Sequence, residues 1–404
     1  MRSHPLNECR LCGSAKLEAV LSFPDSPAGD LYKDAKEVAV ELPRFPLGCN
    51  LCVDCGHVQL SYFVDPEIIY SEYLYVTSDS LGLDQHFQNY ADDLLNYIQS
   101  DSPKTIFEVG CNDGTLLAKL CKAGHRGIGM DPAEYPLRIA ASKGLTVIQD
   151  YFSPESSSKV KNSHGTIDVI IANNVLANVE NLNEVFTSFR EIISSEGVIV
   201  FETGYLEHIA LKKVIDNIHH EHIDYFSVKP LISFLKKNGF YIDRVVINDS
   251  KGSSIRVFAK VGPSTLTSAN VLAIASKEVS HGFFEKTLYS DLTLQIQEES
   301  IRIKTFINSS RSLGHQIVGY GAAIGSTTLL IALDLENELD FLVDDNARRL
   351  GHYSPGAGIP VNSVAELFEA DSAVIVLAWR YGKSILPKLS EISTVKSVTS
   401  IWSE

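Results

Sequence analysis

The chain is short of several kinds of residue, and each shortage excludes a class of protein. Only 7 of its 404 residues are Cys, which is too few for a disulfide-rich secreted scaffold. No apolar run reaches the roughly 18 residues of a membrane span, and the start MRSHPLNECR lacks the apolar core of a signal peptide. We therefore expect a cytoplasmic protein that has no membrane as a partner.

Basic residues are scarce as well. The chain has 35 Lys plus Arg against 50 Asp plus Glu, a net charge of −15. Such a surface repels a phosphate backbone, so nucleic acid is not expected as a partner. With 45% apolar residues the composition is that of a globular protein. At about 150 residues per domain, the length predicts two or three domains.

Five of the seven cysteines fall within the first 55 residues. Four of them belong to two copies of C-x-x-C-G, a tight turn that points both thiolates at one ion and ends in a Gly that accepts a positive φ. These four are Cys9, Cys12, Cys52 and Cys55. Four thiolates leave no open position, so we predict one structural zinc. Cys49 is left out, because Val53 follows Cys52 and resists the turn.

The central region begins as strand, glycine loop and helix. Residues 104–110 (KTIFEVG) are typical of a buried strand, and helical periodicity follows after a group of turn residues. The candidate ligand-binding residues of the loop are Glu108, Gly110, Asn112 and Gly114. The dinucleotide fingerprint G-x-G-x-x-G is not matched. The middle position of the loop in this chain is Asn112, and Asn is the residue other than Gly that best tolerates the left-handed region.

An acidic residue ends the next expected strand. Asp131 lies about 20 residues after the loop, where a carboxylate can accept both hydroxyls of a ribose. Loop and acidic residue together resemble a class I S-adenosylmethionine methyltransferase more than a dehydrogenase. We expect Gln149 to Phe152 to line the adenine, and Asn173 and Asn174 to face the cleft at the carboxyl edge of the sheet. The alternation of strands and helices predicts a parallel, doubly wound α/β sheet.

Three of the 12 histidines fall within four positions of the segment IHHEHIDYF. The metalloprotease spacing H-E-x-x-H is missing, which disfavours a catalytic metal at His219 and His222. A general base supported by a carboxylate suits the cluster better. A His near its unperturbed pKa of about 6.5 accepts a proton at neutral pH, and Glu221 can orient it or hold its charge.

The last third repeats the pattern of strand, glycine loop and helix. Residues 266–313 predict one or two connector helices, and Gly319-x-Gly321-x-x-x-Gly325 follows them. This loop could bind a dinucleotide such as NAD, although its glycine spacing departs from the fingerprint. An NAD-dependent oxidoreductase or epimerase is therefore an alternative function. A non-enzymatic zinc scaffold, the third hypothesis, would leave the histidine cluster unexplained.

Several segments together resemble the sugar C-methyltransferase family, enzymes that methylate a ring carbon of nucleotide-linked keto-deoxysugars. The likeness spans nearly the whole chain. Its segments are PLGCNLCVDCGHVQL (46–60), Tyr73-x-Tyr75-x-Thr77-Ser78, FEVGCNDGTLL, HEHIDYFS, GSSIRV (252–257), GYGAA (319–323) and GHYSPGAGIP (351–360).

The resemblance implies a chain in three parts. They are a zinc-binding domain over 1–70, a class I methyltransferase domain over 71–265, and a Rossmann-like α/β domain over 266–404 that helps hold the sugar nucleotide. The implied cofactors are S-adenosylmethionine and one structural zinc. The implied partner is a nucleotide-linked keto-sugar, and we expect a monomer.

The resemblance also implies roles for single residues. By position, His222 matches the family's base, Glu221 its neighbouring carboxylate, and Tyr75 a tyrosine near the reacting sugar. The carbon next to a ketone is acidic enough for a positioned His to deprotonate, and the enolate carbon can then attack the sulfonium methyl. His219 or Tyr75 would stabilise the enolate oxygen. Sugar O-methylation, which needs a base near a hydroxyl, is the alternative within methyl transfer.

Three positions depart from the family pattern. His219 stands where the family usually has Tyr before H-E-H, Gly325 where it has Lys, and Arg380 within what is usually a W-N-Y segment. These departures predict rearranged phosphate and base contacts and leave the identity of the sugar nucleotide open. Methyl transfer itself is retained.

Overall fold

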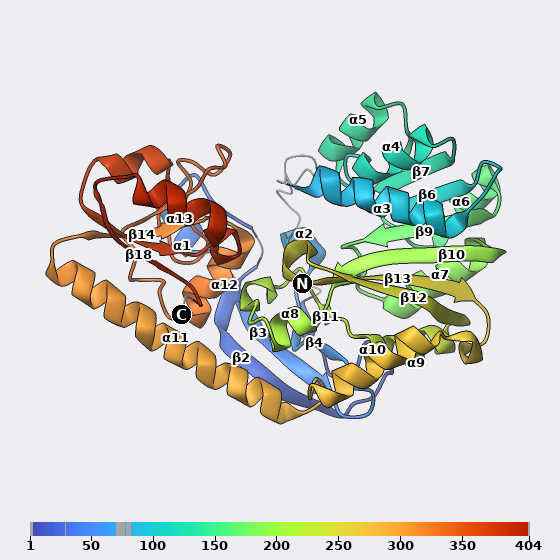
Figure 1. The fold of residues 1–404 in the computed structure, drawn as a ribbon, viewed down its shortest axis with the longest axis horizontal. Coiled ribbons are helices and arrows are strands. Elements are labelled where there is room, and N and C mark those ends of the chain that lie inside the picture. Colours follow the sequence, from blue (N-terminus) through green and yellow to red (C-terminus); the bar gives the residue numbers. More distant parts are fainter. Residues whose placement is uncertain (1–2, 29, 70–76, 78–81, 403–404) are drawn as a thin grey trace.

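The computed structural model describes residues 3–28, 30–69, 77 and 82–402. The described chain forms two lobes above a shared base (Figure 1). The central sheet with its helices makes one lobe, and the carboxyl-terminal sheet makes the other. Strand β2 and the long helix α11 (Lys286–Ser312) run beneath both. In the described part of the chain, no helix is long and apolar enough to cross a membrane.

The amino-terminal part is built on an antiparallel four-stranded sheet in the order β11-β4-β3-β2. Its strands are β2 (Leu17–Pro27), β3 (Arg44–Cys52), β4 (Val58–Leu60) and β11 (Asp224–Tyr225). The smaller elements are β1 (His4–Pro5), which pairs with β5 (Tyr62–Phe63), and the helices α1 (Lys36–Val40) and α2 (Pro66–Ile69). Because β11 comes from the segment that holds the histidine cluster, this small sheet joins the zinc region to the central domain.

The central part is a seven-stranded sheet in the order β12-β13-β10-β9-β6-β7-β8. Its strands are β6 (Thr105–Val109), β7 (Arg126–Asp131), β8 (Thr146–Gln149), β9 (Ile167–Asn173), β10 (Ile193–Gly204), β12 (Phe240–Asn248) and β13 (Ser254–Val261). All five residues of β6 are buried, as expected for a parallel strand covered on both faces.

Helices pack on both faces of this sheet, as in a doubly wound fold (Figure 1). They are α3 (Leu83–Ile98), α4 (Thr115–Lys122), α5 (Glu134–Ser142), α6 (Pro154–His164), α7 (Leu182–Ile192), α8 (Glu207–Ala210), α9 (Val228–Lys237) and α10 (Ala269–Ser280), with short 3₁₀ turns η2 (Ile215–Asn217), η3 (Ser250–Gly252) and η4 (Ser264–Leu266).

The α/β class expected from the sequence is confirmed. The sheet is mixed rather than wholly parallel, because β13 runs antiparallel to both β10 and β12. Residues 249–253 are too short a connection for a parallel crossover.

The carboxyl-terminal part is a five-stranded parallel sheet in the order β16-β15-β14-β17-β18. Its elements are β14 (Gln316–Tyr320), α12 (Ile324–Ala332), β15 (Phe341–Val343), β16 (Val361–Asn362), η5 (Val364–Phe368), β17 (Ser372–Val376), η6 (Trp379–Tyr381), α13 (Gly382–Ser390) and β18 (Val395–Ser400). Strand order and direction make this a second Rossmann-like unit, as expected.

The three parts share one hydrophobic core, which runs from the cysteine repeats through the central sheet to the carboxyl-terminal sheet. The connector predicted over 266–313 consists of two helices. The first, α10, packs on α9 and β12 of the central part, while α11 contacts β2, β14 and β18. Helix α12 contacts β2 and η2. The segment around η2 is therefore held where all three parts meet.

Candidate active site and metal centre

The four cysteines of the C-x-x-C-G repeats converge on one point. Their sulfur atoms all lie within 4.8 Å of one another. The Sγ atoms of Cys9 and Cys55 are 3.5 Å apart and those of Cys12 and Cys52 are 3.6 Å apart. The glycines that follow the two repeats have φ values of +80° and +84°. Four thiolates at this spacing fit a tetrahedral zinc ion.

The other cysteines lie elsewhere. Cys49 is buried in β3, where it pairs across the sheet with Leu60, and burial raises the pKa of its thiol. Among the described residues, no second group of three or more His, Cys, Asp or Glu side chains converges as the quartet does. The histidine cluster is accordingly described below by its hydrogen bonds.

The central glycine loop connects β6 to α4, and its backbone adopts positive φ values that residues with side chains rarely adopt. Gly110 has φ +67° and Gly114 has φ +70°. A Cβ atom at Gly110 would lie 2.2 Å from Cγ2 of Val175, in the turn after β9. Asn112 has φ +48°, and its Oδ1 accepts a hydrogen bond of 2.9 Å from the backbone N–H of Thr77. Thr77 belongs to the Tyr73-x-Tyr75-x-Thr77 motif, so this part of the motif touches the loop.

Two carboxylates flank the loop. Asp131, at the end of β7, accepts backbone hydrogen bonds of 2.9 Å from Asn112 and from Ala133. Glu108, near the end of β6, is 4% exposed, and its Oε2 has no hydrogen-bond partner among the described residues. Burial and then the carboxylates of Asp113 and Asp131 raise the pKa of Glu108 to about 8. A buried, unpartnered carboxyl oxygen beside other carboxylates suits a cationic ligand, and S-adenosylmethionine carries a sulfonium and an ammonium group.

The remaining predicted cofactor residues lie at the carboxyl ends of their strands. Gln149 ends β8 with an exposed side chain, and its Nε2 lies 3.4 Å from the carbonyl oxygen of Pro132. Asn173 ends β9, and its Oδ1 accepts the N–H of Glu202 at 3.0 Å. Asn174 has φ +53° and donates its N–H to the carbonyl oxygen of Glu202 at 2.7 Å. Hydrogen bonds thus hold the two asparagines next to β10, at the carboxyl edge of the sheet where they were expected.

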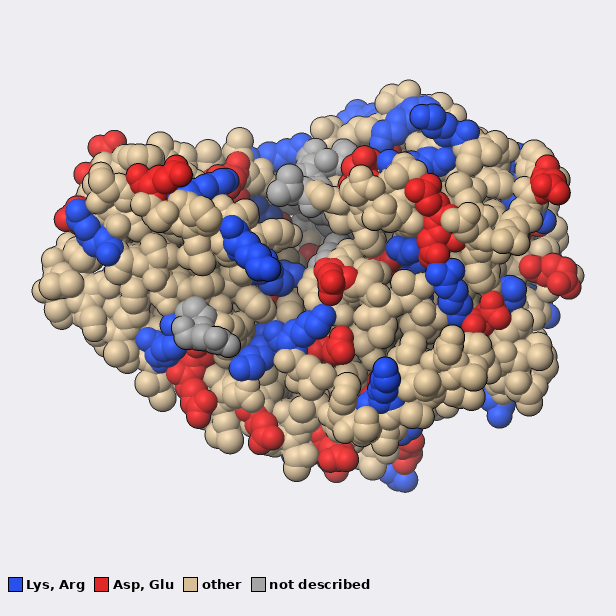
Figure 2. All heavy atoms as spheres, in the orientation of Figure 1, with Lys and Arg blue, Asp and Glu red and all other residues tan. Residues whose placement is uncertain are grey.

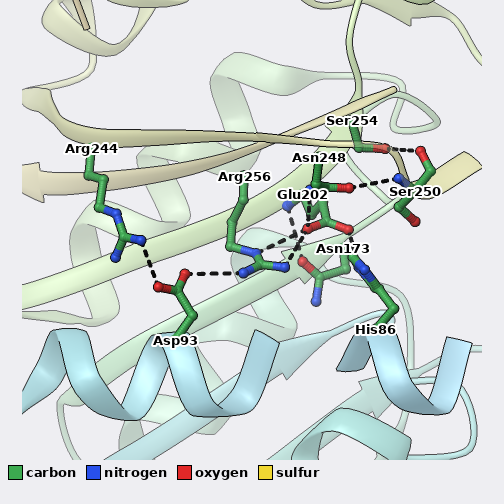
Figure 3. Close-up of polar contacts among 9 residues, drawn as sticks. All are labelled: His86, Asp93, Asn173, Glu202, Arg244, Asn248, Ser250, Ser254 and Arg256. Carbon is green, nitrogen blue, oxygen red and sulfur yellow. Dashed lines mark hydrogen bonds and ion pairs between the residues drawn. The ribbon is translucent and has the colours of Figure 1, made fainter. Parts of the chain in front are cut away.

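A buried charge network lies behind these asparagines, and the sequence analysis missed it (Figure 3). Glu202 of β10 is 2% exposed and contacts His86 Nε2 at 2.5 Å, Arg256 Nη2 at 2.8 Å and Asn248 Nδ2 at 3.1 Å. Burial alone would raise the pKa of Glu202, but the hydrogen bond from His86 and the charge of Arg256 outweigh it and lower the pKa. Asp93 joins Arg256 to Arg244 (Figure 3). A carboxylate inside the apolar strand GVIVFE was the one available sequence signal.

The histidine cluster follows η2. His222 donates its Nδ1–H to the carbonyl oxygen of Asn217 at 3.1 Å, because a carbonyl can only accept. In the neutral ring, Nε2 is then the basic atom. The His219 ring lies beside it, with ring centroids 4.0 Å apart. Glu221 is half-buried. Tyr75, the fourth residue predicted for catalysis, lies outside the described residues.

The other two histidines of this region have structural contacts. His220 is buried, and its Nε2 lies 3.2 Å from the carbonyl oxygen of Pro46 in β3. His208, in α8, contacts the carbonyl oxygen of Ser253 through Nδ1 at 3.2 Å. Burial, and secondly the charge of nearby His222, lower the pKa of His208 to about 3. His208 therefore stays neutral behind the cluster.

The carboxyl-terminal domain holds the start of this segment. Asp216 in η2 accepts hydrogen bonds from Arg380 Nη2 at 2.7 Å and from Trp379 Nε1 at 3.2 Å. A Cβ atom at Gly325 would lie 2.9 Å from the backbone oxygen of Asp216. Thr328 of α12 donates its hydroxyl to the carbonyl oxygen of Ile218 at 2.9 Å. Two of the three departures from the family pattern, Gly325 and Arg380, therefore meet at one carboxylate.

The zinc region and the central sheet hold the end of the segment. The N–H of Ile223 donates to the carbonyl oxygen of Ala177 at 2.6 Å, in the turn after β9. The N–H of Leu60, in β4, donates to the carbonyl oxygen of Ile223 at 2.8 Å. Since Val175 of the same turn packs on Gly110, contacts connect the histidine cluster to the glycine loop.

Comparisons with known families divide the chain into the same sequence of parts. Residues 9–70 match the model described as "Putative zinc binding domain", residues 83–245 match "Methyltransferase domain", and residues 249–399 match "C-methyltransferase C-terminal domain". The third match assigns the second glycine loop to a methyltransferase, which removes the support for an NAD-dependent oxidoreductase. Its start at residue 249 places β13 of the central sheet in the carboxyl-terminal model.

A curated relative matches over almost the whole chain. The C-methyltransferase NovU of Streptomyces niveus is 27% identical over 391 residues, which is 96% of this chain and 93% of the relative.

Solved structures match the central part. Magnesium protoporphyrin IX methyltransferase of Synechocystis with bound SAH is 18% identical, covering 48% of this chain and 90% of that one, with a TM-score of 0.36. The PH0226 protein of Pyrococcus horikoshii is 15% identical, covering 48% of this chain and 97% of that one, with a TM-score of 0.39.

Proposed function

We propose that the chain is an S-adenosylmethionine-dependent C-methyltransferase with a four-cysteine zinc domain, and that it methylates a ring carbon next to the ketone of a nucleotide-linked keto-deoxysugar. The support for this acceptor is the sequence resemblance and the two-lobed architecture. Figure 2 shows lysine and arginine side chains as well as acidic ones on the surface between the two lobes, although the chain as a whole carries a net charge of −15. Basic side chains in this region can pair with an anionic sugar nucleotide.

The observation that carries the proposed chemistry is the hydrogen bond from His222 Nδ1 to the carbonyl oxygen of Asn217. It assigns the proton of the neutral ring to Nδ1, so Nε2 is the basic nitrogen that would take the proton from the carbon next to the ketone. His208, whose pKa is lowered to about 3 chiefly by burial, stays neutral and adds no positive charge next to the protonated His222. We assign His222 as the general base.

Removing that proton leaves negative charge on the former carbonyl oxygen. We assign the His219 ring, whose centroid lies 4.0 Å from that of His222, to donate a hydrogen bond to this oxygen. Glu221 is assigned to hold or polarise His222, and Tyr75 to contact the sugar. These assignments rest on the resemblance and on the position of the segment.

Glu108, Gly110, Asn112, Gly114, Asp131, Gln149, Asn173 and Asn174 are the residues assigned to hold S-adenosylmethionine. When bound there, it supplies an electrophilic methyl group to the enolate carbon. The glycine loop allows close backbone approach, and the carboxyl group of Glu108 offers a partner for positive charge. The cysteine quartet would hold a zinc ion with four thiolates, which leaves no open coordination position for the substrate.

The test is proton exchange in deuterated water. Wild type should exchange the proton next to the ketone of a 4-keto-6-deoxy sugar nucleotide even without a methyl donor, and His222→Ala should slow exchange and methylation by about 10²–10⁴-fold. Cofactor affinity, measured by calorimetry, should not change. His220→Gln is the matched control, because the His220 ring contacts Pro46 and Phe45 of the amino-terminal sheet.

Two results would overturn the assignment. Near-normal exchange by His222→Ala, with His219→Ala inactive, would transfer the base to His219. A methyl group found on oxygen by NMR of the product, without any exchange by wild type, would establish the O-methyltransferase alternative.

A further inference from the structure

Arg10 lies inside the first cysteine repeat, between Cys9 and Cys12, yet its side chain points away from the sulfur atoms into the protein. It is 8% exposed. Its Nε lies 3.0 Å from Oδ1 and 2.9 Å from Oδ2 of Asp224. The backbone N–H of Arg10 donates to Oε1 of Gln59, in β4, at 2.8 Å. The repeat thus carries a buried cation at a fixed position relative to the proposed metal.

The other end of the Arg10 guanidinium contacts a second segment. Nη1 donates to the carbonyl oxygen of Glu180 at 2.8 Å, and Nη2 donates to the carbonyl oxygen of Val179. These carbonyls lie in the turn after β9, which also contains Val175, the residue that packs on Gly110. One planar fork therefore ties together two segments that are far apart in the sequence.

Asp224 is the shared acceptor and lies two residues after His222. Its side chain is fully buried, and it accepts a further hydrogen bond of 2.8 Å from Nε2 of His57, two residues after Cys55. Both cysteine repeats therefore reach the same carboxylate. A buried carboxylate needs such partners, since an unpaired charge there would be strongly unfavourable.

We propose that Arg10 and Asp224 are positioning residues that connect the zinc centre to the histidine segment, so that metal occupancy sets the geometry of the proposed base. In this arrangement the metal does not need to contact the substrate. The metal holds the turn at Cys9 to Cys12, the turn holds the Arg10 guanidinium, and the guanidinium holds Asp224 and the turn after β9. The inference rests on the proposed function only in naming His222 as the group that is positioned.

The first experiment compares Arg10→Lys and Asp224→Asn with wild type. Lys keeps the charge but cannot make three hydrogen bonds in one plane, so the number of turnovers per second should fall about 10–100-fold, as for other residues behind a metal ligand. KM for S-adenosylmethionine and the zinc content should not change. The two substitutions should be non-additive in the double variant, because they break one interaction.

The second measurement is amide hydrogen exchange, which needs no acceptor. In Arg10→Lys, in Asp224→Asn and in wild type stripped of zinc by a chelator, the amides of residues 217–226 should exchange faster, while those of β14 stay protected. Arg311→Lys is the matched control. Arg311 also contacts one carboxylate and one carbonyl, both of Glu338, at 2.6 and 2.7 Å, but in the carboxyl-terminal part.

The outcomes separate the inference from the proposed function. Unchanged exchange over 217–226 and unchanged turnover in both variants, with zinc retained, would overturn the inference. Loss of zinc from Arg10→Lys would also overturn it, because Arg10 would then serve the metal site alone. If the variants unfold, amide hydrogen exchange over residues 217–226 in wild type stripped of zinc still tests the inference. If wild type methylates no keto-sugar nucleotide, the proposed function fails, and the exchange data still test the connection.

Discussion

The central and carboxyl-terminal glycine loops share one design and differ in charge. In both, an Asp at the end of the second strand accepts a backbone N–H of the loop: Asp131 from Asn112 at 2.9 Å, and Asp344 from Ala322 at 2.6 Å. In both, the helix start follows a glycine with positive φ. The shared geometry comes from the same strand, loop and helix topology.

The charges around the two loops are arranged differently. The central loop carries Glu108, one oxygen of which has no hydrogen-bond partner in the described part of the chain, and burial and then the carboxylates around it raise its pKa. Near the second loop, two carboxylates have arginine partners. Asp216 pairs with Arg380, and Asp30 pairs in two places with Arg349 at 2.6 Å. The comparison teaches that one topology can carry different arrangements of charge around its loop, and the proposed function assigns a cationic ligand to the first loop and an anionic ligand to the second.

The strongest way to break this comparison is to add a side chain at either loop. Gly110→Val places a β-branched residue at φ +67° with its Cβ 2.2 Å from Val175, so affinity for S-adenosylmethionine should fall about 100-fold or more. Gly321→Val, with a Cβ 2.8 Å from that of Ala378, should weaken acceptor binding and leave cofactor affinity intact. Calorimetry with each ligand separates the two. Equal loss of cofactor affinity in both variants would contradict the division of labour.

A pH series sharpens the comparison at Glu108. Because burial and neighbouring carboxylates raise its pKa to about 8, proton and cationic cofactor compete for it. Cofactor affinity should rise about 50-fold between about pH 6 and pH 8, as the ionised fraction of Glu108 grows, and should level off above about pH 9. Glu108→Gln should abolish this rise, and calorimetry in buffers of different ionisation enthalpy should show proton release in wild type alone.

The same pKa has a consequence for stability without cofactor. The folded state binds the Glu108 proton more tightly than the unfolded state. The contribution of this proton to the free energy of unfolding is therefore fully present below about pH 4.5 and is lost as pH rises through about 8. Glu108→Gln should therefore raise Tm relative to wild type at pH 8 more than at pH 6. An equal effect at both pH values would show that Glu108 is already ionised.

Arg380→Lys tests the anionic side of the comparison with a smaller change. Lys keeps the charge near Asp216 but loses the planar fork. KM for the sugar nucleotide should rise about fivefold while KM for S-adenosylmethionine stays constant, measured by steady-state kinetics. Arg311→Lys on the far part of α11 serves as the control. A change confined to KM for the cofactor would place Arg380 at the other site.

The smallest expected effect is at Lys143, a cation that contacts the central loop. Its Nζ lies 3.5 Å from Oδ2 of Asp113 and 2.7 Å from the carbonyl oxygen of Asp113, and the side chain is 32% exposed. Lys143→Met removes positive charge close to a cationic ligand, so cofactor affinity should increase about twofold at low salt. The gain should vanish at high salt. A clear loss of affinity would show that Lys143 supports the loop structurally.

Local chemistry was readable from the sequence wherever spacing alone determines geometry. The two C-x-x-C-G turns, the strand and glycine loop ending at Gly114, and Asp131 after the next strand all lie where their patterns predicted. The antiparallel course of β13 was not predicted, because no local pattern states which neighbour a strand will choose. The boundaries at residues 70 and 265 stay predictions, since the parts share one core.

Long-range pairing decided the rest. Arg10 and Asp224 are 214 positions apart, Glu202 and His86 are 116 apart, and Arg380 reaches Asp216 from another domain. Each of these residues looks like an ordinary charged residue in its own neighbourhood. The sequence by itself determined the turns, the glycine loops and the density of histidines, because these depend on backbone preferences over a few residues. Only the tertiary structure decided which buried charges meet, because a buried charge is stabilised by whatever partner the fold brings within hydrogen-bond distance.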